Sequence, residues 1–354
     1  MEYLSYEEFK ERAKNEIRAH LPEEYQEAEV QINEFLKNNV KLDGLTVRKE
    51  GATVTPVVYL QDYYPIYTQT GDITDTLDKM ADTIAAHDGL TMNPDVIRNW
   101  NYARERLTAR LINVDTNREL LETVPYTPFN DLAVTYHVVL QDTKEGIAST
   151  RVTNELLEQY GVSVEELHKE AMLNLAQPGN WQFEDLGAFM AKMMGESERE
   201  MLENMGLDVN HLGEYILTSQ SIHQGAALIA NKDVQQMIAW KLGELAGNRY
   251  VPQDYYVIPS SVHEVLVVPQ TKAEELGLTV EDLSNMVQEV NQGEVAPEDQ
   301  LSDRVYEYNA QTKTLSIAGD RELLDEMKNQ AALDRAIEQA LDEAELTQSA
   351  ALKR

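Results

Sequence analysis

Helical and extended segments follow one another along the whole chain, and this alternation restricts the fold to one that contains both. Residues 5–21 carry apolar side chains at helical spacing, and Ser5 followed by Glu8 is typical of a capping box at a helix start. Three short runs of alternating or β-branched residues come next, at 30–33, 42–47 and 53–60. A helix, three strands and then more helix predict an α+β fold.

The rest of the sequence continues this alternation. Periodic apolar positions predict helices over 72–86, 93–107, 153–160, 163–175, 233–245 and 280–291, and a long C-terminal helix over 320–346. Apolar and β-branched runs predict strands over 111–114, 132–140, 215–218, 226–229, 255–258, 262–268, 305–308 and 314–317. We expect mixed or antiparallel sheets with flanking helices. The chain length indicates two packed units, over 1–150 and 151–320, followed by a C-terminal helix with a frayed tail over 321–354.

Composition narrows the class of protein. The 354 residues include no cysteine, which excludes disulfides, thiolate metal sites and cysteine nucleophiles. The segment Met1–Glu8 has neither a basic start nor an apolar run, so we expect no signal peptide. No segment approaches the roughly 20 apolar residues of a membrane helix. We therefore expect a cytoplasmic protein with no membrane partner.

The chain is strongly acidic, with 62 acidic and 30 basic residues and a formal charge of −32. This charge repels phosphate backbones and argues against direct binding of nucleic acid. Ten acids lie between residues 274 and 307 against the single base Arg304. One interpretation is a solvated face that keeps the protein soluble. The other is a surface that docks on a basic protein, through Glu274, Glu275, Glu281, Asp282, Glu289, Glu294, Glu298 and Asp299.

The sequence contains no motif that clearly indicates an enzymatic reaction. The sequence has no glycine-rich dinucleotide loop, phosphate loop, nucleophile elbow or paired-histidine zinc helix, so we expect no cofactor and no metal. The densest polar segment, residues 259–264, contains Ser260, Ser261, His263 and Glu264. The histidine and glutamate could form an oriented base or a metal pair, and the serines could be nucleophiles or anion donors. Against this, neighbouring strand residues point to opposite faces. A second polar loop, 219–225, contains His223 and would strengthen a catalytic interpretation if it lay close to His263.

Several segments together resemble one known family. These are the helix start at 6–10, the runs at 45–49 and 56–64, and above all the segments at 258–265, 286–291 and 301–306. They are similar to DUF5688, a family of unknown function, over nearly the whole chain to about Tyr308. The resemblance implies a source among Firmicutes, often on a mobile element. It names no chemistry, so no catalytic residue follows from it.

The preferred hypothesis is a non-catalytic interaction protein that engages a basic protein through its acidic face, as an accessory factor of a mobile element. An imitation of DNA would be its most specific form. The alternative is a hydrolase or metal-dependent enzyme that uses Ser260, Ser261, His263 or Glu264 with His223. A third class, a small-molecule sensor, would require a closed pocket.

Overall fold

The computed structural model describes residues 3–52, 55–86, 94–143, 146–194, 212–220, 224–259 and 261–319. Within these ranges the strands form three antiparallel sheets, and helices pack against them. The predicted α+β fold is therefore confirmed, with antiparallel sheets. None of the helices in this part of the chain is long and apolar enough to cross a bilayer.

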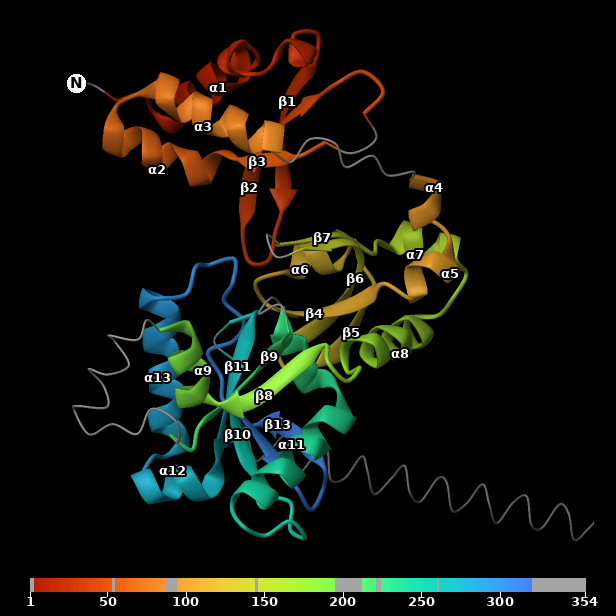
Figure 1. Ribbon diagram of the computed structural model, residues 1–354, viewed down its shortest axis with the longest axis vertical. Coiled ribbons are helices and arrows are strands. Elements are labelled where there is room, and N and C mark those ends of the chain that lie inside the picture. Colours follow the sequence, from red (N-terminus) through yellow and green to blue (C-terminus); the bar gives the residue numbers. More distant parts are fainter. Residues whose placement is uncertain are drawn as a thin grey trace, which may run out of the picture.

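The first sheet and its helices form one end of the molecule. Their bounds are α1 (Tyr6–His20), η1 (Glu23–Tyr25), β1 (Glu29–Leu36), β2 (Lys41–Arg48), β3 (Val57–Tyr59), α2 (Leu60–Thr70) and α3 (Ile73–Ala86). The sheet order is β1-β2-β3, and the first three helices lie together over it (Figure 1). Ser5 and Glu8 form the expected capping box at α1. Phe9 and Ile17 of that helix are buried in one apolar cluster with Leu45 of β2.

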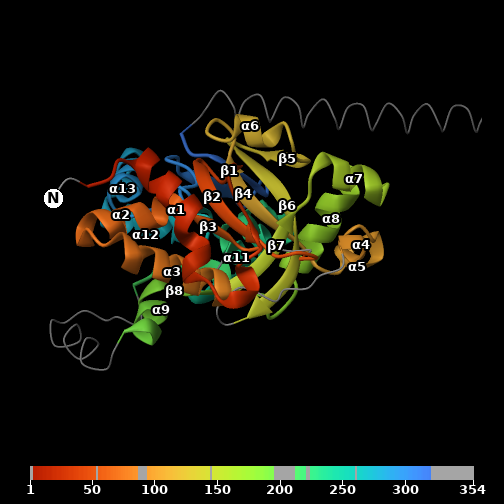
Figure 2. The same cartoon turned by 90° about the horizontal axis from the view of Figure 1, so that it is seen from above.

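The second sheet lies in the middle of the molecule. Its region contains α4 (Pro94–Ile97), α5 (Trp100–Arg104), β4 (Leu107–Asn113), α6 (Arg118–Leu121), β5 (Tyr126–Phe129), β6 (Leu132–Thr143), β7 (Gly146–Arg151), α7 (Asn154–Tyr160) and α8 (Val164–Leu175). The central strand β6 pairs with β4 along one edge and with β5 and then β7 along the other. Figure 2 shows α7 and α8 together along one side of this sheet, with α4 and α5 beside them.

The third sheet has the strand order β13-β12-β10-β11-β9-β8. Its region contains β8 (Trp181–Asp185), α9 (Leu186–Met193), β9 (Tyr215–Ser219), η2 (Gly225–Ala230), α11 (Lys232–Leu245), β10 (Tyr255–Ile258), β11 (Glu264–Pro269), α12 (Gln270–Leu276), α13 (Val280–Gly293), β12 (Tyr306–Asn309) and β13 (Thr314–Ile317). Because strand residues alternate in direction, the two faces bury different sets. Val257 and Val267 share a cluster with α11, whereas Ile258 and Val268 share one with α12 and α13.

Three local predictions were wrong. Residues 226–229 form the 3-10 helix η2 instead of a strand, because a short apolar run does not distinguish a strand from a buried helical turn. Leu107 begins β4 instead of ending a helix from residue 93. The third extended run is short, and α2 begins at Leu60 although Tyr-rich sequence around Pro65 favours extended structure. The predicted helix over 320–346 lies outside the described residues.

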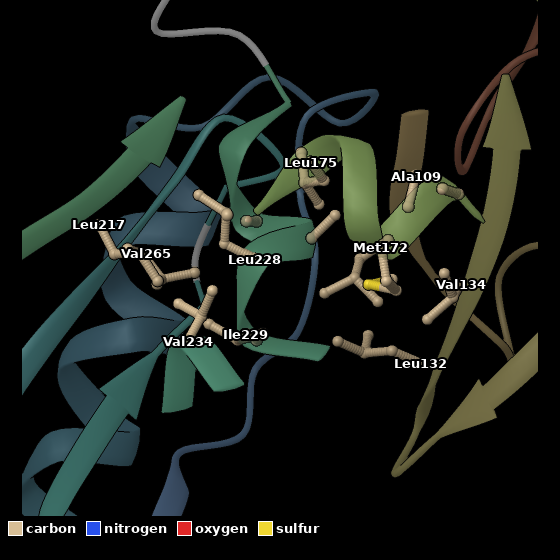
Figure 3. Packing of buried hydrophobic residues seen from close by; sticks show 14 of the residues in the cluster. Ala109, Leu132, Val134, Met172, Leu175, Leu217, Leu228, Ile229, Val234 and Val265 are labelled. Atoms are coloured by element: carbon tan, nitrogen blue, oxygen red, sulfur yellow. The ribbon is translucent and has the colours of Figure 1, made fainter. Parts of the chain in front are cut away.

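The 3-10 helix η2 connects the second and third sheets through apolar contacts. Figure 3 shows Leu228 and Ile229 between residues of the third sheet and those of the second sheet with α8. The largest cluster of buried side chains extends from Ala103 to Ile317 and includes residues before and after position 150. The division into units over 1–150 and 151–320 stays a prediction.

Candidate functional site

The predicted polar segment 259–264 forms the corner that joins β10 to β11. Ser261 is buried and forms an isolated β-bridge with Gln300. Its Oγ accepts a hydrogen bond from the backbone N–H of His263 at 3.0 Å. The N–H of Val262 donates to the carbonyl of Asp299 at 2.8 Å. The corner is therefore fastened to the loop after α13, while Ser260 lies outside the described residues.

The described C-terminal end of the second predicted polar loop, at Gln224 and Gly225, packs against this corner. The N–H of Gly225 donates to the His263 carbonyl at 2.8 Å, and the Thr218 hydroxyl donates to the same carbonyl at 2.9 Å. The N–H of Gln224 donates to Nδ1 of His263 at 3.4 Å. The two polar loops thus meet. His223 itself lies outside the described residues.

The imidazole of His263 is engaged at both ring nitrogens. Nδ1 accepts from the backbone of Gln224, and Nε2 lies 3.1 Å from Oδ1 of Asp299. This pattern places the ring proton on Nε2, facing the carboxylate. A general base must offer a free lone pair within hydrogen-bond reach of the proton it removes. In this arrangement neither nitrogen of His263 offers one.

Glu264 belongs to the same polar network. Burial raises the pKa of its carboxyl, whereas the His263 ring and the Ser261 hydroxyl lower it. The charge of Asp299 also acts on this carboxyl and raises its pKa. His263 lies in a bend before the first residue of β11, so strand alternation does not decide how its side chain lies relative to Glu264.

The described members of this network hold the corner that joins β10 to β11. The Ser261 residue is only 5% exposed, so a substrate cannot reach its hydroxyl without a rearrangement. Within the described ranges, no group of three or more histidine, aspartate or glutamate side chains is arranged to hold a metal ion. The enzymatic alternative also depends on Ser260 and His223, which lie outside the described residues, so it stays a prediction.

The acidic residues predicted to bind a partner fall into two groups. Six are exposed on α12, α13 or the residue that follows α13: Glu274, Glu275, Glu281, Asp282, Glu289 and Glu294. Asp282 closes a capping box with Thr279. The other two, Glu298 and Asp299, line a cavity of about 140 Å³, where Asp299 pairs with His263.

The other wall of this cavity was missed by sequence reasoning. Arg110 of β4 and Arg151 of β7 line it, together with His137 of β6. The sequence held a signal for two of these residues, because Arg110 lies between Ala109 and Leu111 and His137 lies within the largely apolar run 132–140. Basic groups in such positions are uncommon unless they have a specific partner or ligand.

Comparisons with known proteins add a family and no activity. A family model described as a family of unknown function (DUF5688) matches residues 6–310, which is well over half of the chain. No curated protein and no solved structure matches the chain.

Proposed function

The chain belongs to DUF5688, a family of unknown function, and from its own side chains we propose that it is a non-catalytic protein that binds a basic protein partner. The proposed contact is the acidic surface, defined as Glu274, Glu275, Glu281, Asp282, Glu289 and Glu294. It covers α12, α13 and the residue after α13, on one side of the third sheet (Figure 1).

The observation that carries the proposal is that three carboxylates of this surface have no ion-pair partner in the described part of the chain, although Lys272 lies on α12 as well. Within the described residues, no basic side chain forms an ion pair with Glu274, Glu275 or Glu289. Close carboxylates repel one another, and a basic partner would relieve that repulsion on binding. Complementary charge also accelerates encounter and rejects partners of the wrong sign.

Exposed apolar side chains lie among these carboxylates. Met286 and Val290 of α13 are 49% and 41% exposed, and Leu276 at the end of α12 is 51% exposed. Met286 and Val290 are four residues apart, and Glu289 is three residues after Met286, so the three are neighbours on the helix surface. Apolar anchors surrounded by charged residues are the usual composition of a protein–protein contact. The apolar side chains of this surface would therefore contribute binding affinity, and its carboxylates would attract a basic partner.

The proposal extends to the setting in which the protein acts. A cytoplasmic location fits a sequence without cysteine, which needs no oxidising compartment. As an accessory factor of a mobile element, the protein would engage a basic protein that itself binds nucleic acid. The carboxylates of the acidic surface would then occupy the place of backbone phosphates.

Charge reversal on the acidic surface tests the proposal. The triple variant Glu274→Lys, Glu275→Lys and Glu289→Lys is expected to weaken binding of the partner, captured from the native host and then purified, at least tenfold. The control triple Glu11→Lys, Glu27→Lys and Glu158→Lys changes the net charge equally at exposed positions outside this surface. It should bind like the unaltered chain. Calorimetry at two salt concentrations measures both, and the affinity of the unaltered chain should fall as salt rises. Equal losses in the two triples would refute a localised contact.

A further inference from the structure

A cavity lies where the three sheets approach one another. Its volume is about 140 Å³, several times the roughly 30 Å³ that a water molecule occupies in the liquid. Lys37 and Asn38 line it from the connection between β1 and β2. The second sheet contributes Arg110, His137 and Arg151. Gln224, Val262, Glu298 and Asp299 line it from the third region. The space is large enough for an ion of a few heavy atoms.

Positive charge is gathered at this cavity in a chain whose net charge is −32. The Nε atom of Arg110 is buried and has no hydrogen-bond partner. Its Nη2 donates to the hydroxyl of Ser149 at 2.6 Å, which leaves the guanidinium charge uncompensated. A buried donor without a partner costs free energy, so an acceptor supplied by a ligand would be stabilising.

Arg151, the neighbouring arginine, also lacks a charged hydrogen-bond acceptor among the described residues. Nη1 of Arg151 donates to the carbonyl of Leu36 at 3.4 Å, a long hydrogen bond to a neutral acceptor. Among the described residues, neither Arg110 nor Arg151 forms an ion pair with a carboxylate. Burial, together with the nearby Arg151, lowers the pKa of Arg110 to about 10. The two guanidinium groups are therefore partly desolvated and carry like charges close together. Neither has a counter-ion in the described part of the chain.

The charges of the other titratable side chains that line the cavity decide which kind of ligand it could hold. Burial lowers the pKa of His137 well below its usual value, and Arg110, Arg151 and Lys37 lower it further. The imidazole is therefore neutral near pH 7. On the facing wall, Asp299 is already paired with His263. Glu298 is exposed, and its charge adds to burial in raising the pKa of Asp62. Among the described residues, neither carboxylate forms an ion pair with Arg110 or Arg151, so both guanidinium groups keep donors for a ligand.

We infer that the cavity binds a small oxyanion of the phosphate class, held by Arg110, Arg151 and Lys37. A guanidinium group matches the spacing of two oxygens on one phosphorus, and an ammonium group supplies a third charged donor at the mouth. Three cationic donors suit a group with two or more charged oxygens better than a single carboxylate. Because the donors come from β4, β7 and the β1–β2 connection, occupancy would also tie the first sheet to the second.

Binding of inorganic phosphate by the full chain tests this inference. Phosphate should raise the melting temperature in a saturable way, beyond chloride at the same ionic strength. Calorimetry should give one site per chain. Glycerol phosphate forms a second arm: tighter binding than inorganic phosphate would identify a phosphate monoester as the source, and weaker binding would identify free phosphate. Stabilisation by phosphate that equals stabilisation by chloride would overturn the inference.

Two variants and a control separate a binding role from a structural one. Lys37→Gln lies at an exposed position and should weaken phosphate binding about tenfold with the fold intact. Arg110→Gln should abolish phosphate binding, while the ligand-free protein keeps or gains stability because a buried like-charge pair is removed. Arg118→Gln removes an exposed arginine of α6 and should bind phosphate like the unaltered chain. If Lys37→Gln and Arg118→Gln bind phosphate equally well, the assignment is wrong.

Discussion

The Gly225→Ala variant is expected to be destabilised by about 3 kcal/mol or more, at or above the top of the range for overpacked cores. A Cβ at this position would lie 2.2 Å from the backbone N of Ser219, 2.6 Å from Cα of Thr218 and 2.7 Å from the carbonyl O of His263. All three are backbone atoms of the packed corner and its neighbouring strand. None can move aside as a side chain could.

Urea denaturation monitored by circular dichroism measures this effect. Gly293→Ala is the matched control, because a Cβ there meets no atom within 4 Å. At the end of α13 that substitution should change the free energy of unfolding by less than about 1 kcal/mol, in the stabilising direction. If both variants unfold at the same urea concentration, the close contact of η2 with the His263 corner is not real.

Asp131→Ala is expected to lower the free energy of unfolding by about 3 kcal/mol, because two hydrogen bonds to a charged group are lost. The carboxylate, in the turn between β5 and β6, accepts from the Ser302 hydroxyl at 2.8 Å and from the Tyr306 hydroxyl at 2.5 Å. Ser302 and Tyr306 are buried, so the substitution leaves their hydroxyl groups without this acceptor. The hydrogen bond between Asp131 and Tyr306 joins the second sheet to β12 of the third sheet.

A double-mutant cycle isolates this contribution. Tyr306→Phe alone should cost about 1–2 kcal/mol, and in the Asp131→Ala background it should cost much less, since the acceptor is already gone. Both costs come from urea denaturation. Additive costs would show that the carboxylate and the hydroxyl do not interact in solution.

Local signals in the sequence predicted most of the elements. Ser5 with Glu8 and Thr279 with Asp282 each form the capping box that their spacing indicates. The apolar run from Leu132 predicts β6, which is paired along both edges. These elements depend on residues close in the chain, so periodicity and capping patterns are enough.

The remaining features depend on contacts between distant residues. Whether the run 226–229 becomes a strand or η2 is decided by packing between two sheets, which periodicity does not encode. The His263–Asp299 pair joins residues 36 positions apart, and the cavity joins Lys37 to Arg110 and Arg151. Sequence reasoning placed Asp299 on the acidic face because it counted charge along the chain, whereas the structure pairs this residue with a histidine.

The central claim is that α13 and its neighbours form the contact with a basic partner, and methyl NMR tests it most directly. With ¹³C-methyl methionine, Met286 reports on the acidic surface and Met237 of α11, which is 46% exposed, reports on the opposite face of the third sheet. Addition of the purified partner should shift or broaden the Met286 signal and leave Met237 unchanged. A change at Met237 with no change at Met286 would contradict the account.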